Sequence, residues 1–282
     1  MKPVHERPTL RLRATVAFSR LIEWVLSHHR LARFLYGVVD VRSRIAAHAL
    51  AGSARECPCC RGRFSRMGRR RIVGWGGICP RCGSFSRHRA ITLLLDRIDL
   101  PGGRVLHFAP EPLFDRVFAE RPQLERVTAD LYAPADLRLD ITDMDLPDGS
   151  FDLILCSHVL EHVPDDRAAM AEMRRVLSDR GTALVLTPYR PDQPTFEDPS
   201  ITTPIDRMVA FGQHDHVRVY GSDLVDRLGE ARFDVENRTA ADLFDEETIE
   251  RMELDSSEHL FLCWPSPLRG VMESGASSSK EQ

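Results

Sequence analysis

From Arg104 to Pro265, short runs rich in β-branched and other hydrophobic residues alternate with amphipathic segments. This rhythm is typical of a parallel β-sheet whose connecting helices cover both faces, so the expected fold class is α/β. We expect seven strands, at residues 104–109, 125–130, 136–140, 151–157, 182–188, 232–237 and 259–265. Helices are expected at residues 113–120, 166–177, 223–228 and 246–254. Asp165 is the predicted N-cap of the second helix, because it follows a proline and precedes the helical pattern.

Upstream of this region, hydrophobic residues recur every three or four positions between residues 14 and 48, which predicts one or two amphipathic helices. The residues in this stripe are Phe18, Leu21, Val25, Ala32, Leu35 and Val39. Packing on the chain's own domain is the favoured use of the stripe, and a position at a membrane interface is the alternative. The charged residues that interrupt it exclude a stable membrane span. The segment also lacks a signal-peptide cleavage pattern, so a cytoplasmic location is expected.

Charge divides the chain into unlike halves. Residues 1–90 hold 19 Lys and Arg against 4 Asp and Glu, whereas the remainder holds 19 against 38. A basic front end can attract phosphate-rich partners such as RNA, or an anionic membrane. It can equally dock on the acidic domain that follows it, and the sequence leaves both interpretations open.

Two closely matched cysteine pairs lie within the basic half. Cys57 and Cys60 form one CxxC motif, and Cys79 and Cys82 form the second. Four thiolates in this spacing are typical of a tetrahedral structural zinc site, since four protein ligands leave the ion no open position for catalysis. Cys59 is the spare thiol and is expected to be exposed, with its replacement of Cys60 as ligand the alternative. The arginines around these pairs, including Arg87 and Arg89, suggest a phosphate-binding face.

These features divide the chain into four parts. We expect a basic helical segment at residues 1–52, a zinc ribbon at 53–90, a catalytic domain at 91–265 and a disordered tail at 266–282. The tail is predicted from its polar, serine-rich composition. Ala51 to Ser53 is expected to be a linker.

The segment that begins at Leu137 carries a set of motifs in fixed order. Asp140 precedes a loop, Phe151-Asp152 opens a strand, a His-Val-Leu-Glu-His turn follows that strand, and Gly181 comes after a helix that ends in Arg-Val-Leu. On these motifs, residues 105–265 resemble class I S-adenosylmethionine-dependent methyltransferases of the type 11 group. The resemblance implies a Rossmann-like sheet of seven strands and S-adenosylmethionine as cofactor.

The cofactor-binding residues follow partly from position and partly from the resemblance. Asp130 ends the second strand, where a carboxylate can accept hydrogen bonds from both ribose hydroxyls. By resemblance, Asp140 accepts from the adenine amino group, the Ile141 backbone faces the ring, and Ser157 belongs to the same site. A turn or capping role is the alternative for each aspartate.

The loop after the first strand departs from the family pattern, because residues 105–113 contain no glycine. Ala109 is small enough for the cofactor to approach closely. Glu111 is expected to hold the cofactor's ammonium in place of the acid that the family carries in this loop. This His-Phe-Ala-Pro-Glu loop resembles that of a bacterial group of methyltransferase-like proteins with cysteine-rich N-termini.

Candidate catalytic residues follow the later strands. His216, in the loop after the fifth strand, is the expected general base because histidine titrates near neutral pH. Asp215 is expected to orient that imidazole, and Arg218 is expected to clamp a substrate anion. His158 borders the site of the transferable methyl group. The turn of His158, Glu161 and His162 also resembles the metal triad of ubiquinone-pathway and small-RNA O-methyltransferases, so a second metal is the alternative here.

Three functions are consistent with these residues. The first is methyl transfer to an oxygen or nitrogen atom of a small molecule, with zinc as a structural ion. The second is methylation of RNA, with the basic ribbon gripping phosphates. The third, suggested by the missing glycines, is a binding module that keeps the fold without activity. The sequence does not fix an oligomeric state.

Overall fold

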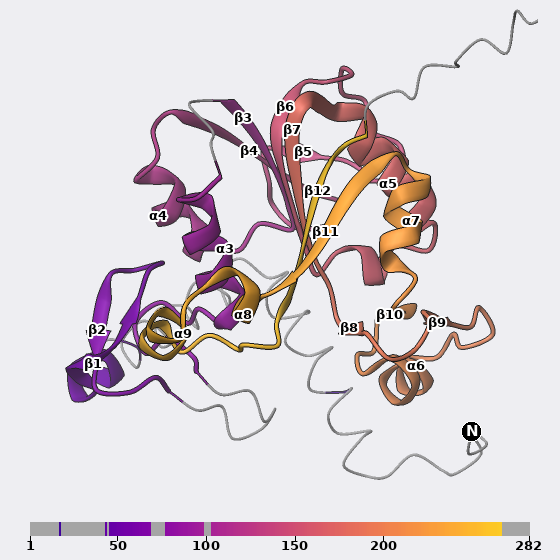
Figure 1. Cartoon of the computed structure of the whole chain (residues 1–282). Helices are drawn as coiled ribbons and strands as arrows, with labels where there is room; N and C mark the ends of the chain where they lie inside the picture. The colour runs from indigo at the N-terminus through magenta and orange to yellow at the C-terminus, as the bar shows by residue number, and fades with distance from the viewer. Residues whose placement is uncertain (1–16, 18–42, 44, 69–76, 99–102, 267–282) are drawn as a thin grey trace, which may run out of the picture.

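The computed structural model describes residues 17, 43, 45–68, 77–98 and 103–266 of the 282-residue chain (Figure 1). Most of the predicted N-terminal helical segment, and the predicted tail after residue 266, lie outside these residues. None of the described helices is long and apolar enough to cross a membrane.

A seven-stranded sheet forms the centre of the structure. Its strands are β3 (Gly103–Phe108), β4 (Leu124–Asp130), β5 (Leu137–Arg138), β6 (Phe151–Ser157), β7 (Leu177–Leu186), β11 (Phe233–Thr239) and β12 (His259–Pro265). They lie in the order β11-β12-β7-β6-β3-β4-β5. β12 runs in the opposite direction to the other six strands. Every predicted strand is present, which confirms the expected Rossmann-like α/β fold.

β7 differs from its prediction, because it begins at Leu177 rather than at Thr182. Leu177 pairs with Phe151, and the register shifts before Thr182 pairs with Leu153. Residues 178–180 are polar and hid this part of the strand from the hydrophobic pattern. Strand pairing requires only backbone groups, so polar residues can continue a ladder that hydrophobicity does not reveal.

Helices cover both faces of the sheet. α4 (Leu113–Ala119), α5 (Asp166–Val176), α7 (Leu224–Glu230) and α9 (Glu246–Met252) occupy the four predicted positions. The Asp165 carboxylate accepts a hydrogen bond from the Ala168 N–H at 3.0 Å, which confirms it as the N-cap of α5. The helices that the pattern did not predict are α3 (Ser86–Leu95), α6 (Pro204–Phe211), the short α8 (Ala240–Leu243) and the 3-10 turn η1 (Leu160–His162).

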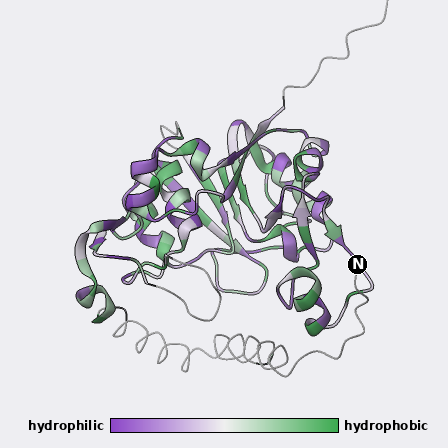
Figure 2. Cartoon of the chain, turned by 60° about the horizontal axis from the view of Figure 1, so that its bottom comes forward, coloured by the Kyte–Doolittle hydropathy of each residue, from purple (hydrophilic) through white to green (hydrophobic). Residues whose placement is uncertain are grey.

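Two hydrophobic cores lie on opposite faces of the sheet. Leu153 and Leu155 of β6 belong to one core, and Ile154 between them belongs to the other, as strand periodicity requires. Figure 2 shows the hydrophobic residues running along the central strands. The first core also contains Phe64 and Met67 from the cysteine-rich segment. That segment is therefore packed into the same hydrophobic core as the sheet.

Two small units lie beside the carboxyl ends of the parallel strands (Figure 1). The first is the hairpin of β1 (Ala51–Cys57) and β2 (Gly62–Phe64), so the predicted linker at residues 51–53 is instead the start of a strand. The second is a three-stranded sheet of β8 (Tyr189–Arg190), β9 (Phe196–Glu197) and β10 (Arg218–Gly221), which no pattern predicted. The boundary expected between residues 90 and 91 falls inside α3.

Candidate functional site

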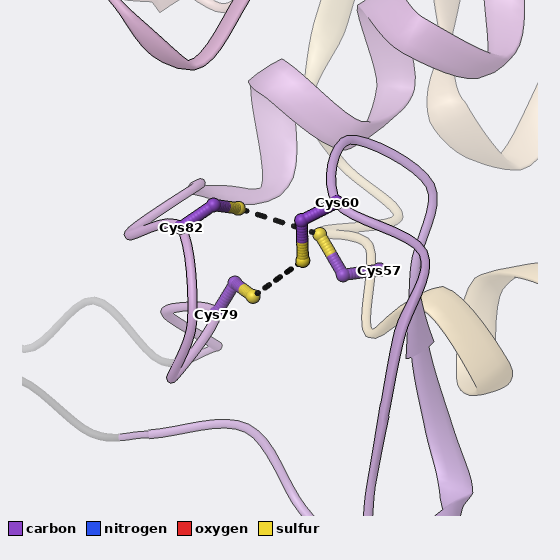
Figure 3. A group of neighbouring side chains, drawn as sticks. All are labelled: Cys57, Cys60, Cys79 and Cys82. Atoms are coloured by element: carbon purple, nitrogen blue, oxygen red, sulfur yellow. Dashed lines mark hydrogen bonds between the residues drawn. The ribbon is translucent and has the colours of Figure 1, made fainter. Parts of the chain in front are cut away.

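The four paired cysteines converge at one point (Figure 3). The Sγ atoms of Cys57 and Cys82 are 3.7 Å apart, and those of Cys60 and Cys79 are 3.5 Å apart. All four sulfurs lie within 4.8 Å of one another. Sulfurs bound at about 2.3 Å to a tetrahedral zinc ion are about 3.8 Å apart, so this spacing fits zinc.

Cys59 has a different position from the one expected. Its side chain is buried, with 2 % exposed, and its Sγ lies 3.2 Å from Thr92 Oγ1 and 3.5 Å from the His88 carbonyl oxygen. It is not among the four clustered sulfurs, so Cys60 is the better ligand of the two. Cys59 instead joins the ribbon to α3.

The arginines of the ribbon fall into two groups. Arg89 is fully buried and donates hydrogen bonds to the carbonyls of Met252 and Glu253, while the side chain of Arg87 is only 16 % exposed. Neither arginine therefore lies on an exposed, phosphate-binding face of the ribbon. The ribbon arginines that the described residues leave exposed are Arg61, Arg63, Arg66 and Arg81. Arg69, Arg70 and Arg71 lie outside the described part of the chain.

The strand order changes direction at β3, which lies between β4 and β6. At such a switch point a crevice opens at the carboxyl ends of the strands, and ligands of this fold class bind there. Ala109 directly follows β3 and His158 directly follows β6, with φ angles of +46° and +57°. Left-handed backbone at two non-glycine residues is unusual and is concentrated at functional sites. Of the five non-glycine residues with positive φ in the described part of the chain, these two border the crevice.

Both aspartates predicted for the cofactor site lie on its β4–β5 side. One oxygen of Asp130 accepts two backbone N–H groups of the following turn, at 2.7 and 2.6 Å. One oxygen of Asp140 likewise accepts from the Thr142 N–H and hydroxyl. Each therefore fills the turn role that was the alternative. The second oxygen of each has no hydrogen bond within the described residues and remains available to a ligand.

Glu111 lies on the other side of the crevice, among basic side chains. Its Oε1 is 3.0 Å from His88 Nε2 and 3.9 Å from the Arg87 guanidinium, and its Oε2 is 3.7 Å from His107 Nε2. Burial raises the pKa of Glu111, but His107 and His88 lower it by more, so the carboxylate is ionised. Within the described residues its Oε2 and the hydroxyl of Ser157 are buried with no hydrogen-bond partner. These orphaned oxygens fit a cofactor that brings donors into the crevice.

A cavity of about 520 Å³ opens beside the crevice. Its walls come from three parts of the chain: the start of α3, the carboxyl ends of β6 and β7, and the segment between α9 and β12. The polar residues that face it include Arg87, His158, Thr187, Tyr189, Glu258 and His259. A larger hollow of about 680 Å³ surrounds the start of β7, at the end of the sheet where this fold class does not bind ligands.

His158 is held at the edge of this cavity by a buried carboxylate. Its Nδ1 is 3.0 Å from Oε1 of Glu161, whose other oxygen accepts the Thr187 hydroxyl at 3.0 Å. Burial raises the pKa of Glu161, but its contacts with His158 and His162 lower it by more, so Glu161 is an anion. An anionic partner requires the proton on Nδ1, which leaves the lone pair of a neutral His158 on Nε2.

His216, the expected general base, lies deeper in the structure. It is 5 % exposed, and its Nε2 is 4.0 Å from Glu161 Oε1. Burial lowers its pKa, and its Nδ1 has no hydrogen-bond partner among the described residues. Asp215 was expected to pair with His216, but it pairs instead with His162, with Nδ1 and Oδ2 3.1 Å apart.

These side chains form a second group with metal-ligand chemistry. Glu161, His162 and His216 each offer one ligand atom, and the three atoms lie within 4.8 Å of one another. Asp215 fixes His162 through Nδ1, which is a common outer-shell arrangement for a histidine ligand. The metal triad suggested by the sequence thus has His216 in the place of His158.

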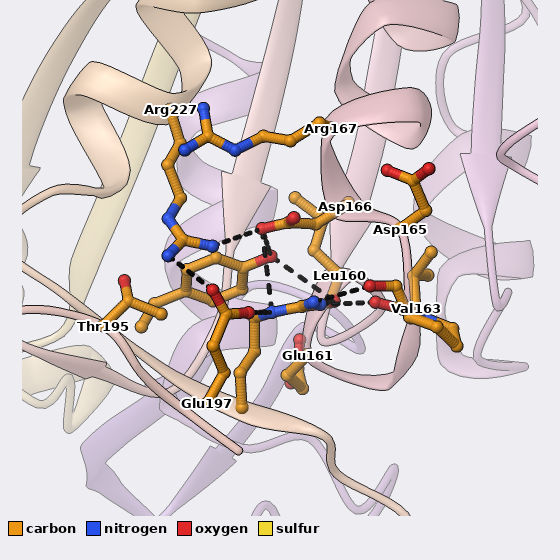
Figure 4. Close-up of polar contacts among 12 residues, drawn as sticks. Leu160, Glu161, Val163, Asp165, Asp166, Arg167, Thr195, Glu197 and Arg227 are labelled. Carbon is orange, nitrogen blue, oxygen red and sulfur yellow. Dashed lines mark hydrogen bonds and ion pairs between the residues drawn. The ribbon is translucent and has the colours of Figure 1, made fainter. Parts of the chain in front are cut away.

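Arg218, expected to clamp a substrate anion, is instead part of a buried ion network. Figure 4 shows Asp166, Glu197 and Arg227 of this network. The Arg218 guanidinium contacts Glu197 at 2.9 Å and Asp166 at 3.7 Å, and it donates to backbone carbonyls of the turn after β6. Arg227 and the Tyr220 hydroxyl also contact Asp166. With 3 % of its surface exposed, Arg218 is committed to holding the η1 turn that carries Glu161.

Replacing Arg218 with alanine should therefore destabilise the fold. The change leaves the carboxylate of Asp166, which is 4 % exposed, with one fewer cation, and breaking a buried pair costs about 3–5 kcal/mol. Urea unfolding of wild type and variant measures the difference. Arg238→Ala is the matched control, because its exposed pair with Glu236 is worth at most about 1 kcal/mol. Equal losses in the two variants would contradict the buried network.

Several contributors to the site were missed at the sequence level. Thr187, which holds Glu161, directly follows β7, and its place at a strand's carboxyl end was an available signal. Arg87 and His88 had no such signal, because they lie in a segment assigned to the ribbon and reach the crevice only through the packing of α3.

Parts of the chain match known proteins. Residues 113–185 match the family model described as a methyltransferase domain. The uncharacterized methyltransferase YcgJ of Bacillus subtilis is 38 % identical over 52 residues, which are 18 % of this chain and 21 % of that protein. Ajmaline N-methyltransferase of Rauvolfia serpentina is 42 % identical over 48 residues, 17 % of this chain and 16 % of that one. The chain thus spans about a fifth of the length of these curated relatives.

Two solved structures align with part of the chain. The crystal structure of YcgJ aligns with a TM-score of 0.42 at 21 % identity, covering 53 % of this chain and 70 % of YcgJ. The Burkholderia thailandensis 1,6-didemethyltoxoflavin-N1-methyltransferase, with 1,6-didemethyltoxoflavin and S-adenosylhomocysteine bound, aligns with a TM-score of 0.42 at 14 % identity, covering 63 % of this chain and 76 % of that one. Residues 113–185 are therefore similar to a methyltransferase domain.

Proposed function

We propose that the chain is an S-adenosylmethionine-dependent methyltransferase that acts on an oxygen or nitrogen nucleophile of a small molecule. The observation that carries this proposal is His158. It follows β6 at the switch point of a methyltransferase sheet, it is oriented by a buried glutamate, and it faces a cavity of about 520 Å³. Cavities of roughly 300–1,000 Å³ suit small organic ligands.

The crevice has groups for each part of the cofactor. The free oxygen of Asp130 would accept from the ribose hydroxyls, and Asp140 with the Ile141 backbone would hold the adenine. The orphaned oxygens of Glu111 and Ser157 would face the methionine end, beside Ala109. When bound, S-adenosylmethionine supplies a methyl group on a positively charged sulfur.

The chain's own part in the reaction is alignment and proton removal. The acceptor lies in the cavity with its attacking atom toward the crevice. His158 Nε2 takes the proton from the acceptor, and the Glu161 carboxylate stabilises the imidazolium through Nδ1. We assign the base to His158 rather than to His216, because His158 lines the cavity whereas His216 is buried beside Glu161.

The experiment that tests this function uses the purified chain with a methyl-labelled cofactor and fractionated cell extract. Label should move to small metabolites and not to RNA or protein. Binding of the cofactor without transfer to any fraction would favour the binding-module function instead.

Asp130 provides a prediction for cofactor affinity. Asp130→Ala should weaken S-adenosylmethionine binding by roughly 10- to 100-fold, because charged hydrogen bonds are worth about 1.5–3 kcal/mol. Asp130→Asn keeps an acceptor for the turn, so it separates loss of the charge from loss of the turn. Isothermal titration calorimetry gives the affinities. Unchanged affinity in the alanine variant would remove Asp130 from the site.

RNA methylation is the second candidate, and the exposed arginines of the ribbon favour it. Arg63, Arg66 and Arg81 remain free to meet phosphates, whereas Arg87 and Arg89 are turned inward. Salt-sensitive retention on RNA that is lost when the three exposed arginines become glutamines would support this function.

A metal-assisted mechanism is the alternative to a histidine base. A divalent ion held by Glu161, His162 and His216 would lower the pKa of an acceptor hydroxyl. In that case the protein would bind a second metal equivalent beside zinc, and His216→Ala would remove the second equivalent alone.

A further inference from the structure

We propose that His88, on the helix that follows the second cysteine pair, is a positioning residue that aims Glu111 at the cofactor's ammonium, so that the zinc ribbon forms part of the cofactor site. The proposal rests on the proposed function and concerns only the methionine end of the cofactor.

The hydrogen bonds of His88 fix which atoms of its ring carry a proton. The ring is buried, and its Nδ1 accepts the backbone N–H of Phe85 at 3.1 Å. Burial lowers the pKa of His88 by more than Glu111 raises it, so the ring is neutral. A neutral ring that accepts at Nδ1 carries its proton on Nε2, and this proton is donated to Glu111 Oε1 at 3.0 Å.

Among the described residues, His88 is the one side chain within hydrogen-bond distance of the Glu111 carboxylate, because Arg87 is 3.9 Å from Oε1 and His107 is 3.7 Å from Oε2. With Oε1 bound to His88, Oε2 is the oxygen that lies buried without a partner among the described residues. An unpaired buried carboxylate oxygen is costly unless a donor arrives, and an ammonium is such a donor. The loop needs outside support, because Ala109 holds a left-handed backbone without glycine.

The support comes from the ribbon through α3. Cys59 Sγ contacts the His88 carbonyl and the Thr92 hydroxyl, and Cys57 Sγ lies 3.2 Å from the Ser84 hydroxyl. Arg89 donates to the Ser84 carbonyl at 2.8 Å and so ties the second cysteine loop to the helix. Loss of zinc would loosen these contacts and release His88 from Glu111. Linkage is reciprocal, so cofactor binding should in turn retain the zinc.

The position of Glu111 makes the effect selective. Asp130 and Asp140, on the adenosine side, make their hydrogen bonds within their own turns and make none with α3 among the described residues. The affinity for a ligand without the amino-acid chain should therefore not depend on His88.

Calorimetry with two ligands tests this. S-adenosylhomocysteine keeps the ammonium, whereas 5′-methylthioadenosine lacks the amino-acid chain. His88→Phe keeps an aromatic ring that packs against Phe114 but removes the N–H donor. It should weaken binding of S-adenosylhomocysteine at least about 10-fold and leave the affinity for methylthioadenosine unchanged. Glu111→Gln should show the same selective loss, and the double variant should lose little more than either single one. His88→Gln, which restores an N–H donor, should recover much of the affinity.

The same proteins test the link to zinc. Excess S-adenosylhomocysteine should slow chelator-driven zinc release from wild type, while methylthioadenosine should not, and the difference should vanish in His88→Phe. His48→Phe makes the same exchange at an exposed position and is the control.

Other results would overturn either the proposed function or the role of His88. Wild type that binds neither ligand would overturn the proposed function. If wild type binds both ligands and His88→Phe binds S-adenosylhomocysteine with wild-type affinity, the role of His88 alone is overturned. The same holds if His88→Phe loses affinity equally for both ligands. Should His88→Phe fail to fold, Glu111→Gln carries the test, and wild-type affinity for S-adenosylhomocysteine in that variant would overturn the proposal.

Discussion

Replacing His158 with alanine should lower the rate of methyl transfer by about 10²- to 10⁴-fold, the usual contribution of general acid–base catalysis. The expectation follows from three contacts: the imidazole faces the cavity, its Nδ1 is bound by Glu161, and Glu161 is fixed by Thr187. Cofactor affinity should stay nearly constant, because the proposed cofactor contacts come from the ends of β4 and β5, the loop after β3 and the Ser157 hydroxyl, and none comes from the His158 side chain. Initial-rate kinetics beside calorimetry separates the two effects.

His216→Ala is the informative comparison for this variant. His216 is about 4 Å from the same glutamate but is buried, so its loss should reduce turnover far less than the loss of His158. If His216→Ala has the larger defect and a chelator reproduces it in wild type, the metal-assisted mechanism replaces the histidine base.

Replacing Cys57 or Cys82 with serine should release zinc and cost more than about 4 kcal/mol of the free energy of unfolding, since zinc binding supplies folding energy directly. The damage should reach the catalytic domain, because Phe64 and Met67 of the ribbon share a hydrophobic core with Leu153 and Leu155 of β6. Metal analysis and denaturant unfolding followed at the sheet measure both effects.

Cys59→Ala is the control for the zinc prediction. Cys59 is buried but lies outside the sulfur cluster, so this variant should keep one zinc per chain. Zinc loss from Cys59→Ala with retention in Cys60→Ala would reverse the choice of ligand. A folded, reduced wild type without zinc would contradict the site as a whole.

The sequence by itself determined the elements of the central sheet. Each strand carries its own hydrophobic run, and helices such as α5 carry a cap and an amphipathic face within one short segment. Each of these signals lies within about ten residues, so it can be recognised without knowledge of the fold. The cysteine pairs were equally explicit, because ligand spacing in sequence reflects the reach of two thiolates to one ion.

Some elements that the hydrophobic pattern did not predict nevertheless carry local signals. α6 begins with Thr203 as N-cap and Pro204 in its first turn, and it ends at Gly212 in a left-handed conformation. This is a complete set of start and stop signals. The short strands β8 to β10 offered less, because two to four residues are too few for a period to be seen.

Only the tertiary structure decided which side chains meet. Nothing local distinguishes His158 from His216, and Arg218 has the same charge whether it binds a substrate or Asp166. The roles of His216 and Arg218 depend on burial and on partners more than 50 residues away, such as the contact of Arg218 with the turn at Leu160. The same is true of His88 and Glu111, which come together only because the ribbon packs α3 against the end of β3. Periodicity records which face of an element is buried, but the partner on that face is set by the packing of the whole chain.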